Sequence, residues 1–242
     1  MRVPRIFTDQ PLQAGRQVPR DKRAHRYVSQ VLRLRAGQRL ILFNGDGSDF
    51  DAILSHCDRK RCSADVLAAS SSGSPTALQV HLGIGVSRGE RMDFALQKAV
   101  ELGAESLTPL FSERSVVQLG AQRLERRFSH WRGVVISACE QSGRHYLPEL
   151  CPAGSLSDWL AAHRGGLMLY HRATQSLADL PAPTRPALSL LIGPEGGLSE
   201  RERALALANE FVAVRLGPRI LRTETAPIAA LAAIQVLWGD FR

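Results

Sequence analysis

The chain has 242 residues, of which 44% are hydrophobic, and a formal net charge of +8 at pH 7. This length and apolar content suffice for a buried core in one large domain or two smaller ones. The sequence has no run of about 18 apolar residues, the length that a membrane-spanning helix needs. Its first ten residues also lack the apolar core of a secretory signal. We therefore expect a cytoplasmic protein with no membrane contact.

The basic residues are concentrated at one end of the chain. Residues 1–75 hold 13 Lys and Arg against seven Asp and no Glu, a balance of +6, whereas the remainder holds 18 against 16. Nearly all are arginines, whose planar fork suits phosphates and base edges. A basic first third favours binding to nucleic acid over the alternative, a merely solvated basic surface.

Four cysteines occur, namely Cys57, Cys62, Cys139 and Cys151. No CxxC pair and no His/Cys pattern with zinc spacing is present among them. This spacing favours free thiols over disulfides or a metal site.

In chain order, the first third predicts a small β-rich domain that carries arginines. Residues 25–35 have the apolar stripe of a short helix. A hairpin is predicted from strands over 39–44 and 50–55 around a Gly-Asp-Gly-Ser turn, and residues 63–67 add a strand. The small and polar residues 68–77 are typical of a linker.

After residue 77, strands and helices alternate. We expect strands over residues 78–86, 107–111, 167–170, 188–192 and 211–216. We expect helices over residues 90–102, 121–141, 200–209 and 225–238. Ser199 and Glu202 form a predicted capping box at the start of the third helix. Such alternation predicts an α/β domain with a mostly parallel sheet and helices on both faces.

The segment Gly193-Pro194-Glu195-Gly196-Gly197 follows a predicted buried strand and precedes a capped helix. Ligands of open α/β sheets bind where such loops gather, at the carboxyl ends of the strands. The loop lacks the GK[ST] of a phosphate-binding P-loop, and Glu195 would repel a phosphate but suits ribose hydroxyls or a cationic group. A tight turn is the alternative, but these features favour a nucleotide-like ligand without phosphates, such as S-adenosylmethionine.

Residues 216–226, LGPRILRTETA, form a second candidate loop between the next strand and the last helix. Arg219 and Arg222 supply positive charge there. Thr223 or Thr225 can cap the helix that follows. A loop that only connects core elements needs no such collection of polar groups, so a functional role is favoured.

Three other signals are weaker. Residues 83–89 resemble the dinucleotide fingerprint GxGxxG, but the third glycine comes one residue late and the glycines interrupt a strand. Residues 140–144, EQSGR, end the long helix with polar groups able to contact a base, although a helix C-cap at Gly143 explains the glycine without function. His171 follows a buried strand, and it either faces the same cleft or is structural.

At these residues the sequence resembles the ribosomal RNA (uracil-N3) methyltransferases of the RsmE type, in the SPOUT superfamily. The matching segments run nearly end to end in the expected order: MRVPRIF (1–7), RGERMDFALQKAVELG (88–103), PLFSERS (109–115), SACEQSGR (137–144), LLIGPEGGLSERE (190–202) and LGPRILRTETA (216–226). Two positions depart from the pattern. Leu198 replaces the aromatic residue often found after GPEGG, and Pro227 stands where a small residue or Thr is usual.

The resemblance implies a PUA-like β-barrel over residues 1–72 and an α/β methyltransferase domain over residues 73–242, with a parallel sheet and a C-terminal trefoil knot. It implies a homodimer that uses S-adenosylmethionine, without a metal, to methylate N3 of a uridine in the decoding region of 16S ribosomal RNA, as free RNA or in the 30S subunit. The implied cofactor residues are Leu169, His171, Ile192, Gly193, Glu195, Gly196, Gly197, Leu216, Gly217, Ile220, Leu221 and Thr225.

For catalysis, uracil must lose its N3 proton, so negative charge develops on N3 and on the flanking carbonyl oxygens. An arginine aimed at these oxygens would stabilise that charge. The candidates are Arg222 and Arg88, with Arg144 third. Glu140 or Glu224 is the candidate proton acceptor.

The candidates for binding RNA phosphates are the arginines of the first domain, Arg2, Arg5, Arg26 and Arg33. Two alternatives for the whole protein stay open. One is a methyltransferase of the same superfamily that acts on another RNA, such as transfer RNA, or on a ribose hydroxyl. The other is a non-catalytic RNA-binding or ribosome-assembly factor that keeps the fold.

Overall fold

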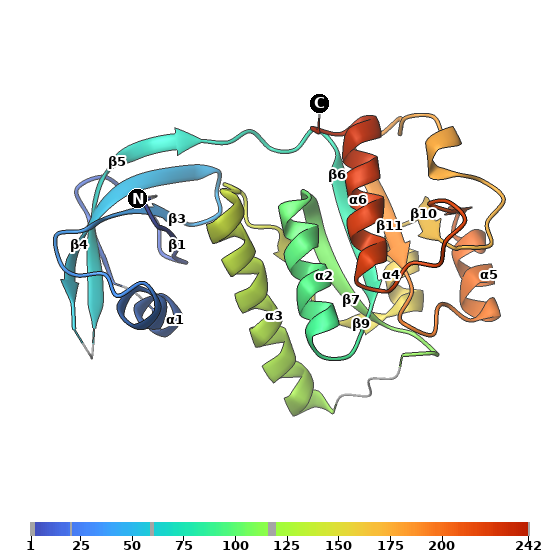
Figure 1. The fold of residues 1–242 in the computed structure, drawn as a ribbon, viewed down its shortest axis with the longest axis horizontal. Coiled ribbons are helices and arrows are strands. Elements are labelled where there is room, and N and C mark those ends of the chain that lie inside the picture. The colour runs from blue at the N-terminus through green and yellow to red at the C-terminus, as the bar shows by residue number, and fades with distance from the viewer. Residues whose placement is uncertain (1–2, 20, 59–60, 116–119, 242) are drawn as a thin grey trace. The chain divides into compact units, whose positions relative to one another are not determined.

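The chain divides into two compact units (Figure 1). The structure, a computed structural model, describes residues 3–19, 21–58, 61–115 and 120–241. The first unit comprises Met1–Pro75 and Ile136–Leu147, and the second comprises Thr76–Val135 and Pro148–Arg242. The first unit thus ends close to the boundary expected after residue 72. It also recruits a later segment, which the sequence did not predict.

The first unit contains a five-stranded sheet with the strand order β1-β3-β4-β5-β2. Its strands are β1 (Arg5–Phe7), β2 (Gln17–Pro19), β3 (Arg39–Phe43), β4 (Ser48–Cys57) and β5 (Cys62–Ser72). β1 pairs with β3 in parallel, and the other neighbours are antiparallel. Side chains that alternate along the strands fill one core, in which Ile6, Leu42 and Leu54 are fully buried.

The helix predicted over residues 25–35 begins earlier than expected and is irregular. α1 (Lys22–Arg26) starts after Asp21, whose side chain accepts a hydrogen bond from the Ala24 amide at 2.7 Å. The chain then continues as a π-helix, η1 (Tyr27–Val31). Asp is among the preferred N-cap residues, so Asp21 was the sequence signal for the true start.

The prediction of a linker over residues 68–77 was wrong in its first half. β5 extends to Ser72, because the long strand β4 pairs with it to the end, Ser48 opposite Ser72 and Asp49 opposite Ser71. Backbone pairing along a long partner strand outweighs the weak strand preference of small polar residues.

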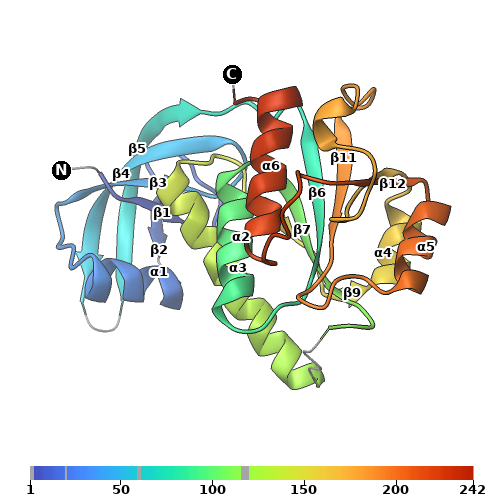
Figure 2. The ribbon, with the colours of Figure 1, turned by 45° about the vertical axis from the view of Figure 1, so that its right-hand side comes forward.

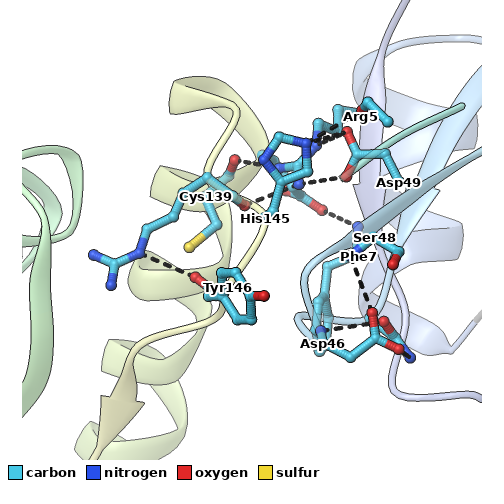
Figure 3. Close-up of polar contacts among 12 residues, drawn as sticks. Arg5, Phe7, Asp46, Ser48, Asp49, Cys139, His145 and Tyr146 are labelled. Carbon is cyan, nitrogen blue, oxygen red and sulfur yellow. Dashed lines mark hydrogen bonds and ion pairs between the residues drawn. The ribbon is translucent and has the colours of Figure 1, made fainter. Parts of the chain in front are cut away.

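Residues 136–147 are held in the first unit by a buried arginine (Figure 3). Arg5 forms a two-point ion pair with Asp49, with N–O distances of 2.8 and 2.7 Å. It also donates to the carbonyl oxygens of Cys139 and Arg144, at 2.7 and 2.8 Å. Both charged side chains are only 7% exposed. Removing one partner of such a pair costs about 3–5 kcal/mol, so Arg5 is a structural residue of this unit.

Glu140 makes the second connection inside the first unit. Its carboxylate accepts a hydrogen bond from the Phe7 amide at 3.0 Å and pairs with the Arg23 guanidinium at 2.7 Å. The Glu140 side chain is buried. One carboxylate therefore joins the segment 136–147 to both β1 and α1 of the same unit.

The second unit contains a seven-stranded sheet in which every described pairing is parallel. Its strands are β6 (Gln79–Gly85), β7 (Ala104–Phe111), β8 (Glu149–Leu150), β9 (Gly154–Ser155), β10 (Gly166–Leu169), β11 (Ala187–Ile192) and β12 (Phe211–Val214). They pair in the order β12-β10-β11-β6-β7-β8, and β9 also pairs with β7.

Helices cover both faces of this sheet, as the alternation of elements predicted (Figures 1 and 2). They are α2 (Glu90–Glu101), α3 (Ala121–Ser142), α4 (Leu156–Ala162), the short 3-10 helix η2 (Leu177–Asp179), α5 (Glu200–Ala208) and α6 (Thr225–Trp238). α2 and α6 pack together, and α4 packs with α5. The residues of α3 up to Val135 belong to this unit, and those from Ile136 belong to the first. Among the described helices, none is both long and apolar enough to cross a membrane.

Two of the three glycines in residues 83–89 have a packing role. Gly83 and Gly85 lie inside β6. A Cβ atom on Gly83 would lie 2.8 Å from the Trp159 ring, and one on Gly85 would collide with the backbone nitrogen of Pro194. Gly85 therefore allows the GPEGG loop to lie directly against β6.

Candidate cofactor and active site

Three neighbouring parallel strands, β12, β10 and β11, end at the same edge of the second unit's sheet. The loop after β11 begins with Gly193, and the loop after β10 begins with Tyr170. The loop after β12 leads to α6 at Thr225. Because carboxyl ends of parallel strands lie together, the two loops predicted to bind a ligand are brought to one place.

A cavity of about 790 Å³ opens at this edge, a volume typical of small-molecule sites. Every cofactor residue implied by the resemblance lines it, except Thr225. Of the catalytic candidates, Arg222 and Glu224 also line it. The structure thus assembles residues from three separate segments into one site.

The GPEGG loop is held in a tight turn. Gly197 has a φ of +66°, and its amide donates to the Pro194 carbonyl at 2.8 Å. Leu198, which replaces the usual aromatic residue, is 7% exposed and packs in a core cluster with Trp159 and Phe211. An aliphatic side chain therefore anchors the end of the loop.

Glu195 fastens this loop to the start of α2. Its Oε1 atom accepts a hydrogen bond from the Arg88 amide at 3.1 Å and lies 3.6 Å from the Arg91 guanidinium. The side chain is 21% exposed and lines the cavity. Glu195 thus places negative charge at the cavity wall, where the sequence had predicted it would repel a phosphate.

Arginines supply most of the charge around the cavity. The lining arginines are Arg91, Arg114, Arg172, Arg203, Arg215, Arg219 and Arg222. Only Arg219 and Arg222 were singled out from the sequence. The others follow strands or open helices at the same sheet edge, a signal that becomes readable once the strand order is known.

Arg114 is positioned in the cavity by a buried carboxylate. Glu202 accepts hydrogen bonds from the amides of Glu113 and Ser199, at 2.8 and 2.7 Å, and is 6% exposed. Arg114 itself donates to the Gly196 carbonyl at 3.2 Å. Glu202 therefore joins the loop after β7 to the helix that follows GPEGG. The predicted capping box of Ser199 and Glu202 is confirmed, and Glu202 also makes the contact with the loop after β7.

Glu224 occupies the N-cap position of α6 and makes no side-chain capping bond. The prediction that Thr223 or Thr225 caps this helix was wrong, because the N-cap falls between them. The Glu224 Oε2 atom is buried and has no hydrogen-bond partner among the described residues. Since a buried polar atom without a partner is costly, this oxygen is a candidate to meet a ligand or substrate group.

Both domains of the chain match known protein families. A family model described as RNA methyltransferase domain matches residues 74–235, and one described as RNA methyltransferase PUA domain matches residues 22–67. The ribosomal RNA small subunit methyltransferase E of Buchnera aphidicola subsp. Schizaphis graminum (strain Sg) is 34% identical over 242 residues, which covers 99% of this chain and 98% of that protein. The chain belongs to the ribosomal RNA small subunit methyltransferase E family.

Two solved structures share the fold of this chain over its whole length. The ribosomal RNA small subunit methyltransferase E from Neisseria gonorrhoeae, bound to S-adenosyl methionine, has a TM-score of 0.91 and 38% identity, and the match covers 100% of both chains. A putative methyltransferase from Legionella pneumophila, in complex with the cofactor SAM, has a TM-score of 0.95 and 34% identity over 100% of both chains. The predicted α/β fold with a PUA-like first domain is thereby confirmed.

Two catalytic candidates within the family's motifs belong to the first unit, whereas the cavity is formed by the second. Glu140 and Arg144 both belong to the first unit. Both carboxylate oxygens of Glu140 are engaged by Arg23 and the Phe7 amide, and its role as proton acceptor stays a prediction. Arg144 donates from Nε to the Tyr146 carbonyl at 3.0 Å, which orders the chain after α3. Neither residue lines the cavity.

Arg88 lies at the cavity's edge through its backbone. Its amide bonds to Glu195, whereas its exposed side chain is not among the groups that line the cavity. This placement indicates that the loop before α2 contributes main-chain contacts to the site.

The arginines predicted to bind RNA fall into three groups. Arg2 lies outside the described residues. Arg26 and Arg33 are exposed. Arg5 is buried with its guanidinium donors directed to Asp49 and two carbonyl groups, and its contact with RNA stays a prediction.

The four cysteines, all among the described residues, form no disulfide. Burial raises the pKa of the Cys139 thiol to about 12. Within the described ranges, no group of three or more His, Cys, Asp or Glu residues is arranged to hold a metal ion.

Proposed function

We propose that this chain methylates ribosomal RNA of the small subunit with S-adenosylmethionine as donor, at N3 of a uridine in the decoding region of 16S RNA. The observation that carries the proposal is the cavity of about 790 Å³ at the carboxyl edge of the sheet, lined by both motif loops. Support for the cofactor comes from two full-length structural relatives solved with it bound.

The cavity's residues suit a nucleoside that carries a charged amino-acid tail. Leu169, Ile192 and Leu221 provide apolar surface for a purine ring. Glu195 provides negative charge for sulfonium and ammonium groups. When bound, the cofactor would supply an activated methyl group.

The chain's own residues have two tasks toward uracil. Glu224 is the proposed acceptor of the N3 proton, because its buried Oε2 atom has no partner among the residues that the structure describes and the residue lines the cavity. Arg222 is proposed to stabilise the negative charge that develops on the flanking carbonyl oxygens. Arg222 and Glu224 are two positions apart on one loop, so the orientation of that loop sets both roles.

The first unit is the proposed RNA-binding domain, with Arg26 and Arg33 as exposed contacts to phosphates. The match of a PUA domain of RNA methyltransferases to residues 22–67 supports this role. A homodimer, a C-terminal trefoil knot and a cytoplasmic location also belong to the proposal. They follow from the family resemblance and from a ribosomal substrate.

The proposal is tested by incubating the purified chain with labelled S-adenosylmethionine and unmodified small subunits, free 16S RNA or transfer RNA. Label in small-subunit RNA and a cofactor-dependent rise of the melting temperature are expected. Label only in transfer RNA would reassign the substrate. Cofactor binding without any transfer would favour a non-catalytic RNA-binding factor.

A further inference from the structure

The first half of α3 presents a basic surface that the proposed reaction does not use. Arg123, Arg126, Arg127 and His130 line a shallow hollow of about 480 Å³. We call these four residues the α3 basic surface. All four belong to the second unit, which also contains the cofactor cavity.

The four residues share one face of the helix. An α-helix turns by about 100° per residue, so positions spaced three and four apart, as these are, project in nearly the same direction. By the same geometry, Glu125 projects to roughly the opposite side. In the part of the chain that the structure describes, Arg123, Arg126 and Arg127 have no ion-pair partner. Their charges are therefore available to an external anion.

Helix stability does not explain these arginines. α3 has no acidic residue in its first turn, where Arg123 stands. The amino end of a helix carries a partial positive charge that favours anions and disfavours cations. A sequence that breaks such a local preference does so most often at a functional site. An anionic partner would turn this unfavourable placement into a favourable one.

The α3 basic surface adjoins the helix turn that lines the cavity. His130 bonds through Nε2 to the Asp93 carboxylate of α2 at 2.7 Å. Arg91, two residues earlier on α2, lines the cofactor cavity. The first turn of α2 therefore has one residue, Asp93, that contacts the α3 basic surface and another, Arg91, that lines the cavity.

We propose that the α3 basic surface binds the phosphate backbone of the RNA substrate beside the cavity. This inference rests on the proposed function and adds a second phosphate contact, on the catalytic unit. Among the described residues, those that line the hollow are three arginines and one histidine, whereas the centre of a protein–protein interface is enriched in aromatic and apolar residues. Arginine forks also match phosphate geometry. RNA is therefore the occupant that the chemistry favours.

The test compares two triple variants of the full chain. Arg123→Gln, Arg126→Gln and Arg127→Gln remove the charges and keep a good helix former. The control variant carries Arg164→Gln, Arg185→Gln and Arg201→Gln. It removes the same charge from exposed positions of the same unit, outside the cofactor cavity and outside the hollow on α3. A third variant with lysine at positions 123, 126 and 127 keeps the charge. Each is measured for RNA affinity over a range of salt concentrations, for KM and kcat, and for cofactor binding.

The α3 glutamine variant is expected to raise KM for small-subunit RNA about tenfold at moderate salt, with kcat and cofactor affinity unchanged. The slope of the logarithm of RNA affinity against the logarithm of salt concentration should become shallower by about 2, since each phosphate contact contributes roughly 0.7–0.9 to that slope. The lysine variant should keep the wild-type slope. The control variant should change KM by less than about twofold.

An equal effect of the two glutamine variants would overturn the inference, because net charge alone would then explain it. A loss seen only with assembled subunits and not with free RNA would assign the surface to a ribosomal protein instead. Failure of the proposed function is distinguishable, because the unaltered chain itself would then transfer no methyl group.

Discussion

Two glutamates of the second unit, each with a buried carboxylate oxygen, illustrate how the surroundings of a residue decide its role. Glu202 is satisfied by two backbone amides, which makes it a structural clamp between loops. Glu224 has an oxygen without a partner among the described residues, beside the cavity. A glutamate side chain therefore stabilises the fold at position 202 and is available for chemistry at position 224.

Replacement of Glu224 by Gln is expected to lower kcat about 100-fold or more, because general-base catalysis contributes about 10²–10⁴. Cofactor affinity should fall by much less, since the side chain keeps its size. Single-turnover methyl transfer and equilibrium binding measure the two effects. The exposed Glu210 offers a matched Gln control. Full turnover by Glu224→Gln would remove Glu224 from the mechanism.

Replacement of Glu202 by Gln is expected to lower the free energy of unfolding by about 1–3 kcal/mol, since an amide NH₂ would face one of two backbone N–H donors. Turnover should fall as well, because Arg114 loses its support. Chemical denaturation measures the first effect. Glu200→Gln, at an exposed position of the same helical turn, should change stability by less than about 0.5 kcal/mol. Equal stability of both variants would contradict the clamp.

The Cys139 thiol is expected to resist alkylation in the folded protein, because burial raises its pKa from 9.0 to about 12. The raised pKa also implies a pH dependence. Above pH 9 the unfolded chain ionises this thiol first, so the free energy of unfolding should fall between pH 9 and 12, by about 1 kcal/mol at pH 10. Mass spectrometry after alkylation at pH 8.5 should find Cys57 modified before Cys139. Rapid modification of Cys139 without denaturant would refute its burial.

At the scale of elements, local signals predicted well what local interactions determine. The bounds of α6 match the expected helix over 225–238, and the capping box of Ser199 and Glu202 forms with both hydrogen bonds present. Errors arose where distant partners decide. The end of β5 depends on β4, and the recruitment of residues 136–147 depends on Arg5, more than a hundred residues away.

The packing of GPEGG against β6 yields a prediction about a glycine. Replacement of Gly85 by Ala would push a Cβ atom into the Pro194 backbone and displace the loop. Cofactor affinity is expected to fall at least tenfold, as measured by calorimetry. The control is Gly154→Ala, where a Cβ atom would meet open space within the same unit. Unchanged affinity in Gly85→Ala would show that the loop does not depend on this contact.

At the scale of the whole molecule, sequence reasoning identified two loops that line the cavity, because the residues of each loop are consecutive in the chain. It missed Arg91 and Arg114, because only the strand order brings the segments after β6 and β7 to the same edge. It did not predict the contacts of Glu140 with Arg23 and the Phe7 amide. These partners lie more than a hundred residues away in the sequence, so no local pattern indicates them.

Mapping of the methylated nucleotide in unmodified small subunits, after incubation with the chain and S-adenosylmethionine, tests the proposed reaction. We expect one new methyl group, on N3 of a single uridine in the decoding region of 16S RNA, and its loss with the Arg222→Ala variant. Methylation of another base or of a ribose hydroxyl, or no methylation by a chain that binds the cofactor, would contradict it.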